Sequence, residues 1–180
     1  MNILPSPPLP RRFFLDFETT GLDPAKAHVL EVALRGAAHL DRLISDAPAS
    51  SPEALRVHGI SPDLCHQKGR PGRKVLGELI DDLGTNPVEI VAHNAPFERA
   101  FLEAWAAREH MLLPEIHWIC TLALSRRLLP KAPTGYRLGA LATALGWRTE
   151  GLHRAAADAE LTQRLCSTLE SWEMAKLAVG

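Results

Sequence analysis

Two acidic residues interrupt an apolar stretch near the N-terminus. The segment "FFLDFETTGLDP", residues 13–24, carries Asp16 and Glu18 separated by a single residue. Alternate residues of a β-strand project from the same face, so the two carboxylates would lie together, with Leu15 and Phe17 on the opposite face. Neighbouring buried carboxylates repel each other, and a divalent cation that prefers oxygen ligands, such as Mg²⁺ or Mn²⁺, would remove the repulsion. The alternative is a strand end at which both acids reach solvent or an arginine.

A third acid follows a second predicted strand. In "VAHNAPFERAFLE", residues 91–103, the strand runs into a helix through His93 and Asn94, and Glu98 falls in the first helical turn. Glu98 is therefore a further candidate ligand. The alternative is an acid that only complements the helix dipole.

A histidine and a fourth acid occur together near the C-terminus. In "GLHRAAADAELTQRL", residues 151–165, His153 precedes an alanine-rich helix and Asp158 lies inside it. Aspartate has a mediocre helix propensity, so its place within a helix calls for a reason. A metal ligand at Asp158 with His153 as a nearby general base would supply one. The alternative is a solvated aspartate beside a histidine that only precedes the helix.

These candidates are positioned by a predicted alternation of strands and helices. Apolar periodicity and turn residues predict strands at 12–17, 28–34, 38–45, 88–93 and 116–121. They predict helices at 72–84, 94–109, 121–128, 136–145 and 155–174. The apolar residues expected on one face of the second of these helices are Phe97, Ala100, Phe101 and Ala104. Early strands, late helices and βα alternation between them predict a layered α/β domain.

Composition limits the class of protein. The chain has 180 residues, of which 46% are hydrophobic, and this suits a single globular domain with its own core. We expect residues 1–11 to form a flexible proline-rich tail and residues 12–176 to form the domain. No segment is long and apolar enough to span a membrane. The three cysteines lie far apart and form neither a zinc-binding spacing nor a disulfide framework, so we expect reduced thiols in a cytoplasmic protein.

The balance of charge bears on possible partners. The net charge is -1 and the pI is about 6.7, so no strong basic field announces a nucleic-acid-binding protein. Any contact with a polyanion would come from metal ions or from a local basic patch. The two candidate patches are residues 69–74 and the pair Arg126 and Arg127.

The segments "DFETTG", "HNAPFE" and "HRAAAD", in this order, resemble the three motifs of the DEDDh 3′–5′ exonucleases. This DnaQ-like family includes the proofreading epsilon subunit of bacterial DNA polymerase III. The resemblance covers about residues 12–170 and is supported by "EVAL", "VHGIS" and "GYRLGALATALGW". Each motif is weak by itself, whereas the ordered set is specific. The resemblance implies a ribonuclease-H-like fold, in which a central mixed five-stranded sheet is flanked by helices.

The resemblance also implies residue roles. Two divalent metal ions, Mg²⁺ or Mn²⁺, would be held by Asp16, Glu18, Glu98 and Asp158. His153 would act as the general base for a water that attacks the last phosphodiester, and the product would be a nucleoside 5′-monophosphate. The residues implied to contact or frame the terminal nucleotide are Phe17, Thr19, Thr20, Gly21, Leu22, His58, His93 and Asn94. Gly21 is expected to allow a tight turn beside the site, and His93 and Asn94 to brace the second motif.

The substrate implied is the 3′ end of single-stranded nucleic acid, with DNA favoured. The alternatives are a 3′–5′ exoribonuclease or oligoribonuclease, a nucleic-acid-binding domain with impaired catalysis, and a hydrolase of small phosphodiesters. The chain has no evident clamp-binding peptide, so we expect a free-standing nuclease or one domain of a longer protein. A polymerase or another replication or repair partner is left open.

Glu98 departs from the family pattern, in which the corresponding acid is usually Asp. The charge and both oxygens remain, but the side chain is one methylene longer. We expect metal binding to persist with an adjusted second metal, and activity to be lower or to prefer Mn²⁺. Titrating Mg²⁺ and Mn²⁺ into the wild type and into Glu98→Asp should give different activity profiles, and identical profiles would contradict this expectation.

Overall fold

The computed structural model describes residues 10–129, 131–132 and 134–179. Most of the predicted tail, residues 1–9, lies outside this description. Its last residue, Arg11, is the first residue of β1, so this strand begins one residue before the predicted strand at 12–17.

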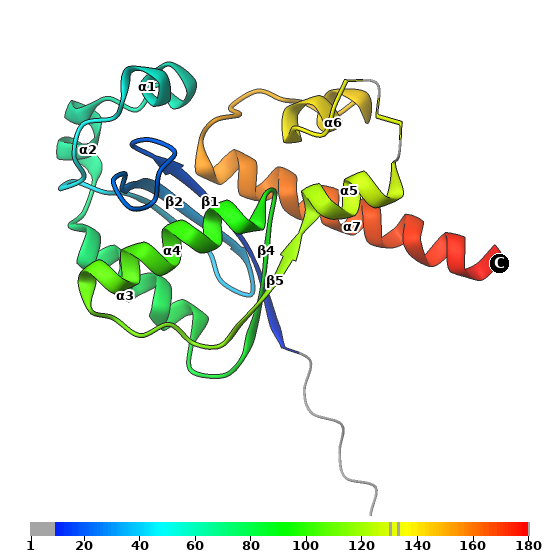
Figure 1. The fold of residues 1–180 in the computed structure, drawn as a ribbon, viewed down its shortest axis with the longest axis horizontal. Helices are drawn as coiled ribbons and strands as arrows, with labels where there is room; N and C mark the ends of the chain where they lie inside the picture. The colour runs from blue at the N-terminus through cyan, green and yellow to red at the C-terminus, as the bar shows by residue number, and fades with distance from the viewer. Residues whose placement is uncertain (1–9, 130, 133, 180) are drawn as a thin grey trace, which may run out of the picture.

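Within the described residues, one mixed sheet has five strands in the order β3-β2-β1-β4-β5. The strands are β1 (Arg11–Thr19), β2 (Val29–Gly36), β3 (Leu40–Leu43), β4 (Val88–Ala92) and β5 (Ile116–Cys120). β2 is antiparallel to β1 and β3, whereas β4 is parallel to β1 and β5. The carboxyl ends of β1, β4 and β5 therefore meet at the same end of the sheet (Figure 1).

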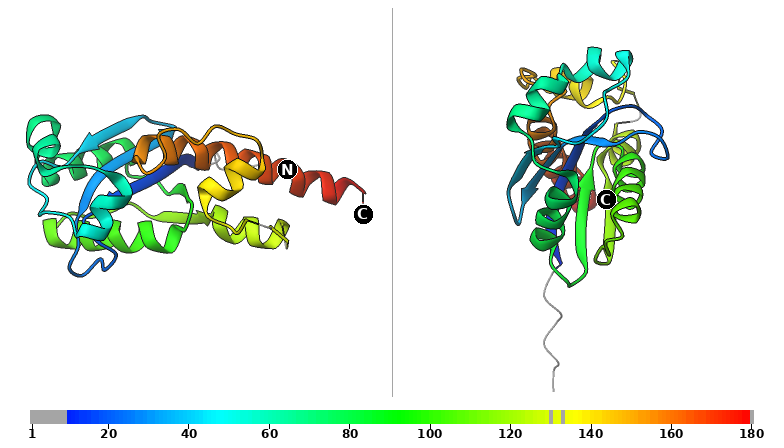
Figure 2. Two further views of the ribbon diagram at one scale, coloured as in Figure 1. Left: turned by 90° about the horizontal axis from the view of Figure 1, so that it is seen from above. Right: turned by 90° about the vertical axis from the view of Figure 1, so that its left-hand side faces the viewer.

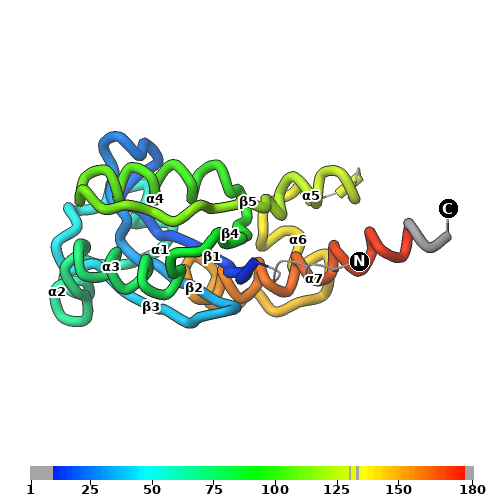
Figure 3. Tube along the Cα trace, turned by 90° about the horizontal axis from the view of Figure 1, so that it is seen from below, coloured from blue at the N-terminus to red at the C-terminus, as the bar shows by residue number. Residues whose placement is uncertain are grey.

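The helices connect and cover these strands. They are α1 (Pro52–His58), α2 (Pro62–Lys68), α3 (Gly72–Leu83), α4 (Ala95–Glu109), α5 (Thr121–Leu128), α6 (Leu138–Ala144) and α7 (Ala155–Val179). α5 and α6 pack on α7 through an apolar cluster that includes Leu141, Leu165 and Leu169 (Figure 3). No helix within the described ranges combines the length and the apolar character needed to cross a bilayer. The predicted fold class, a mixed five-stranded sheet flanked by helices, is confirmed.

Different helices cover the two faces of β1. The β1 side chains that enter the main apolar core, together with α3 and α4, are Phe13, Leu15 and Phe17. Phe14 packs on the other face against Cys166 of α7. Asp16 and Glu18 alternate with the core residues and so share the α7 face, as predicted. Figure 2 shows the sheet lying between α4 and α7.

The buried stripe of α4 differs from the predicted one. The fully buried residues of this helix are Ala95, Glu98, Phe101, Leu102, Trp105 and Ala106. Of the predicted stripe, only Phe101 is fully buried. α4 has apolar residues around most of its circumference, so periodicity did not select the face, and packing of Leu102 and Trp105 into the core rotates the helix. The rotation places Glu98 on the buried face.

Two short helices, α1 and α2, were not predicted. Each begins with a serine followed by a proline, and the serine hydroxyl accepts a backbone N–H three residues later, Ser51 from Ala54 at 3.1 Å and Ser61 from Leu64 at 3.2 Å. Serine at the N-cap and proline at the first helical position are a recognised start signal. The Ser-Pro pairs at 51–52 and 61–62 were the available signal, and apolar periodicity takes no account of them.

Candidate active site

Three carboxylates meet at the carboxyl end of β1. Asp16 and Glu18 extend from β1, and Asp158 extends from the first turn of α7, which packs across that face of the sheet. One oxygen from each lies within 4.8 Å of the others. Asp158 follows Glu18 by 140 residues in the sequence, and the docking of α7 on β1 brings it to the other two acids.

Glu98 lies near this group but belongs to a different helix. It is in the first turn of α4, directly after β4, the parallel neighbour of β1. It is only 4% exposed, and its Oε2 has no hydrogen-bond partner. It is not a member of the group within 4.8 Å, but its charge reaches Asp16 and Glu18. Because Glu98 is buried and interacts electrostatically with two other acids, complementing the helix dipole does not by itself explain its position.

The acids disturb one another's protonation. Burial, followed by the carboxylate of Asp158, raises the pKa of Glu18 to about 8. Burial likewise raises the pKa of Glu98 to about 8 and that of Asp158 to about 6. Burial and the neighbouring carboxylate of Glu98 raise the pKa of Asp16 well above its ordinary value. Without a counter-charge, Glu18 and Glu98 therefore hold protons at neutral pH, whereas Asp158 is mostly ionised.

The donor set fits divalent cations. The ligands are hard carboxylate oxygens, which Mg²⁺ and Mn²⁺ prefer. Oδ1 of Asp158 and Oε2 of Glu98 are buried without a hydrogen-bond partner, so each has a free lone pair to offer. The residues that would hold a metal are therefore the four predicted ones, with Glu98 set apart from the group of three.

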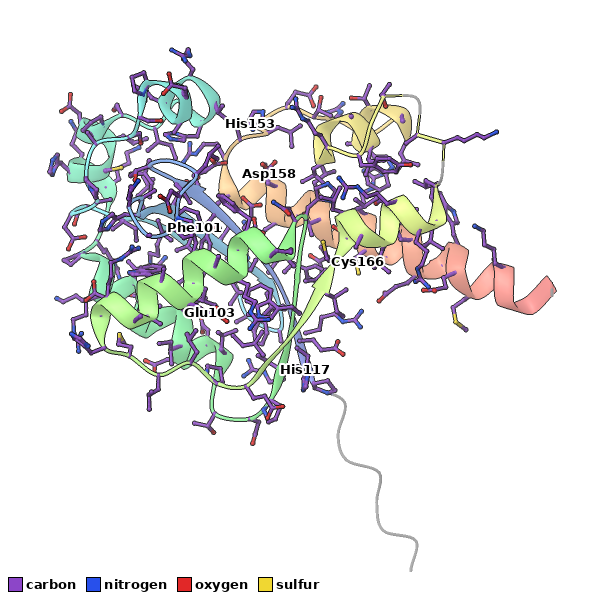
Figure 4. The ribbon with its side chains drawn as sticks, in the orientation of Figure 1. Phe101, Glu103, His117, His153, Asp158 and Cys166 are labelled. Atoms are coloured by element: carbon purple, nitrogen blue, oxygen red, sulfur yellow. The ribbon has the colours of Figure 1, made fainter. Side chains whose placement is uncertain are left out.

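His153 stands at the entrance of α7, next to Asp158 (Figure 4). Its backbone has a φ of 65°, and its N–H donates to Oδ2 of Asp158 at 3.3 Å. The residue is exposed. This left-handed conformation and the hydrogen bond hold the residue beside the acid and leave its imidazole at the protein surface.

Glu31 was not among the predicted site residues, yet it anchors this loop. It lies on β2 directly opposite Glu18 and is 7% exposed. Its carboxylate accepts from Nε and Nη2 of Arg154 and, at 3.0 Å, from the backbone N–H of Ala155, the first residue of α7. The available signal was an acid inside the otherwise apolar strand "HVLEVAL", because a buried charge needs a partner.

A small apolar cavity of about 220 Å³ adjoins the acids. Its wall contains Glu18 and five of the predicted substrate-contacting residues, namely Phe17, Thr19, Gly21, Leu22 and His58. Val57 of α1 and Phe97 of α4 complete the apolar lining. Leu22 is 84% exposed and stands at the rim, where an apolar ligand would cover it.

Thr20 has a structural role instead of the expected contact with the nucleotide, and Gly21 is not needed for the turn. Thr20 does not line the cavity; it is buried, and its hydroxyl accepts the backbone N–H of His28 at 2.9 Å, which closes the turn. Gly21 has no positive φ, and a Cβ placed there would be 3.4 Å from Cβ of Ala27, an ordinary contact. The turn itself therefore does not require glycine at this position.

The remaining predicted residues brace the site. His93 follows β4 and makes two hydrogen bonds: its Nε2 donates to the carbonyl of Tyr136 at 2.8 Å, and its Nδ1 accepts from the hydroxyl of Thr121 at 2.9 Å. Burial lowers its pKa, which favours a neutral ring that donates from Nε2. Asn94, with a φ of 100°, makes the sharp turn into α4. His58 is buried and accepts the N–H of Ile60 through Nδ1 at 2.9 Å.

The fold and the acidic cluster together define the class of protein: a ribonuclease-H-like α/β domain with carboxylates gathered at the carboxyl end of its central strand. The family model described as "Exonuclease" matches residues 13–166. The chain belongs to this exonuclease family, and the predicted resemblance to the DnaQ-like exonucleases is confirmed.

Several proteins are similar to this chain. DNA polymerase III PolC-type of Thermotoga maritima is 34% identical over 157 residues, which are 84% of this chain and 11% of that protein. DNA polymerase III subunit epsilon of Rickettsia prowazekii is 30% identical over 84% of this chain and 70% of that protein. Ribonuclease T of Baumannia cicadellinicola is 29% identical over 88% of this chain and 83% of that protein.

The fold is similar to that of E. coli exonuclease I. The TM-score is 0.80 for its structure in complex with a dT13 oligonucleotide and 0.73 for its complex with a dA16 oligonucleotide. In the dT13 complex the enzyme is 18% identical, and the match covers 94% of this chain and 43% of that chain. At this identity, the likeness establishes the shared fold.

The raised pKa values predict how metal and pH act on stability. Without metal, Glu18 and Glu98 bind protons more tightly when folded, so the free energy of unfolding should fall as pH rises from the ordinary carboxylate range towards about 8. A bound cation would offset the repulsion between the ionised acids. Mg²⁺ or Mn²⁺ should therefore raise the melting temperature more near pH 8 than near pH 6, measured against EDTA. Glu18→Gln should reduce the difference, and an equal shift at both pH values would refute the prediction.

Loss of Glu31 should disturb the metal site from a distance. Glu31→Gln would leave Arg154 without its counter-charge beside Glu18 and would release the start of α7. We expect Mn²⁺ affinity, measured by calorimetry, to fall about 10–100-fold, as for other residues that orient metal ligands. Glu78→Gln is the matched control, because the Glu78 carboxylate also accepts from arginine side chains, those of Arg42 and Arg70, but lies on α3. Equal effects of the two substitutions would exclude a positioning role.

Proposed function

We propose that this chain is a metal-dependent 3′–5′ exonuclease that removes nucleoside 5′-monophosphates from single-stranded nucleic acid. The observation that carries the proposal is the group of three carboxylates, with oxygens within 4.8 Å, beside the exposed His153. Such a group is costly to bury, and bound cations would offset that cost.

The small cavity supports cleavage at a chain end. At about 220 Å³ it is smaller than the cavities of about 300–1,000 Å³ that hold drug-sized ligands, and it suits one nucleoside. Its apolar wall would contact a base, and because Glu18 belongs to the same wall, the adjoining phosphate would lie near the acids. A terminal residue seated there would present its phosphodiester to the metal ligands.

The chain's own residues have distinct tasks in this reaction. Asp16, Glu18 and Asp158 would hold the divalent cations, with Glu98 completing the set. When bound, a pair of such cations activates water and neutralises charge on the phosphate and on the leaving oxygen. His153 would accept the proton of the attacking water, and the hydrogen bond from its backbone N–H to Asp158 supports this role by keeping the residue beside the acids.

DNA is the favoured substrate. The PolC-type and epsilon relatives are named as parts of DNA polymerase III, and the E. coli exonuclease I structure contains a DNA strand. RNA is the second candidate, because the match to ribonuclease T extends over 83% of that protein. The choice would depend on a few contacts to the 2′ position of the sugar.

The test compares a 5′-labelled single-stranded DNA with its RNA counterpart, each incubated in Mg²⁺, in Mn²⁺ and in EDTA. The wild type should produce a ladder that shortens from the 3′ end only when metal is present. Asp16→Asn should abolish it, and His153→Gln should slow it about 10²–10⁴-fold, the usual contribution of a general base. The faster of the two strands identifies the substrate class.

His117→Gln is the matched control, because His117 is an exposed histidine on β5, remote from the acids (Figure 4). This variant should degrade the strands as fast as the wild type. Strand binding that ignores EDTA, with no ladder in either metal, would instead favour a binding domain. Internal cleavage products would exclude an exonuclease.

A further inference from the structure

A second and larger cavity lies on the other side of the acids. Its volume is about 750 Å³, and its wall contains His153 and Asp158. The small cavity includes residues of α1, whereas the large one includes residues of α5 and α6. Figure 1 shows α1 and α6 on either side of the first turn of α7. The catalytic acids therefore stand between two cavities of different size.

The large cavity is basic where the small one is apolar. Arg126 of α5 and Arg137, just before α6, both line it and are exposed. Neither forms an ion pair with any described residue. The neighbouring Arg127 does, with Glu173 at 2.6 Å, and it does not line the cavity. Two arginines without acidic partners in one concave surface are suited to an anionic ligand.

Tyr136 links this basic surface to the catalytic end of the sheet. The guanidinium carbon of Arg126 lies 5.9 Å from the centre of the Tyr136 ring, in cation–π geometry. Hydrogen bonds fix both the side chain and the backbone of Tyr136. Its hydroxyl donates to the carbonyl of Leu129 at 2.6 Å, and its backbone carbonyl accepts from His93 at 2.8 Å. An aromatic ring in such a position can also stack against a base.

We propose that the large cavity binds the nucleotides on the 5′ side of the bond that is cleaved, with Arg126 and Arg137 on their phosphates and Tyr136 against a base. This inference rests on the proposed function. A strand whose last nucleoside occupies the small cavity passes the acids and continues on the other side, where its next phosphates meet the arginines. The net charge of -1 gives the protein no general attraction for a polyanion, so a local pair of arginines has a specific task.

The proposal makes substrate length the decisive variable. A dinucleotide has only the phosphodiester that is cleaved, whereas a longer strand also places phosphates in the large cavity. The preference of the wild type for a short oligothymidylate over a dinucleotide, expressed as kcat/KM, should therefore shrink in Arg126→Ala and Arg137→Ala. It should shrink most in the double variant and stay at the wild-type value in Arg127→Ala, the matched control.

Binding is measured separately by fluorescence anisotropy of a labelled oligothymidylate, with Asp16→Asn as the background so that no strand is consumed. Each arginine removed should weaken binding about tenfold, as for a lost charge-assisted hydrogen bond. Each should also reduce the slope of log affinity against log salt concentration by about 0.7, the value for one phosphate contact on a single strand. Arg126→Lys keeps the charge and should recover part of the affinity.

The two proposals can fail separately. If the wild type degrades strands but the Arg126 and Arg137 variants behave like Arg127→Ala in length preference, affinity and salt slope, the inference about the cavity is overturned and the proposed function stands. If the wild type degrades nothing, the proposed function fails, and the anisotropy series still decides whether the arginines bind a strand. Thermal melting of each variant checks that a lost contact is not a lost fold.

Discussion

The repulsion among carboxylates buried at one end of the central strand is the constraint on which the rest of the structure depends. Asp16, Glu18 and Asp158 have oxygens within 4.8 Å of one another, and burial raises the pKa of each. The repulsion would drive the acids apart if the backbone that carries them could move. This backbone is held in place, because β1 is paired with a strand on each side and α7 is packed across its face. The apolar core therefore holds the acids in a geometry that they would not adopt by themselves.

Glu31 and Arg154 resolve part of this electrostatic conflict. Glu31 lies opposite Glu18 on the neighbouring strand, where two like charges would destabilise the sheet. The guanidinium of Arg154 and the backbone N–H of Ala155 satisfy Glu31 and fix the start of α7. Glu31 is thereby paired with the guanidinium of Arg154, which leaves Asp16, Glu18 and Asp158 as the candidates for holding metal ions. The same contact positions the two predicted site residues that flank it, His153 and Asp158.

The two cavities make the two sides of the acidic cluster chemically different. The smaller is apolar and suits one nucleoside, and the larger carries unpaired arginines beside a fixed tyrosine ring. Glu18 belongs to the wall of the first and Asp158 to the wall of the second, so the predicted metal ligands lie at the boundary between them. A ligand that spans this boundary would have a polar, repetitively anionic part and an apolar end, which is the chemistry of a nucleic acid strand.

The sequence by itself determined the class of fold and the family, and it predicted the four acids and His153 as site residues, because strand alternation and the ordered motifs are local patterns. It also determined that Asp16 and Glu18 share a face. Only the tertiary structure decided which face of α4 is buried, and with it the burial of Glu98, because helix rotation follows from packing against the whole core. It likewise decided that Thr20 closes a turn and that Glu31 anchors α7. These roles depend on partners that are distant in the chain, and local sequence patterns carry no information about such partners.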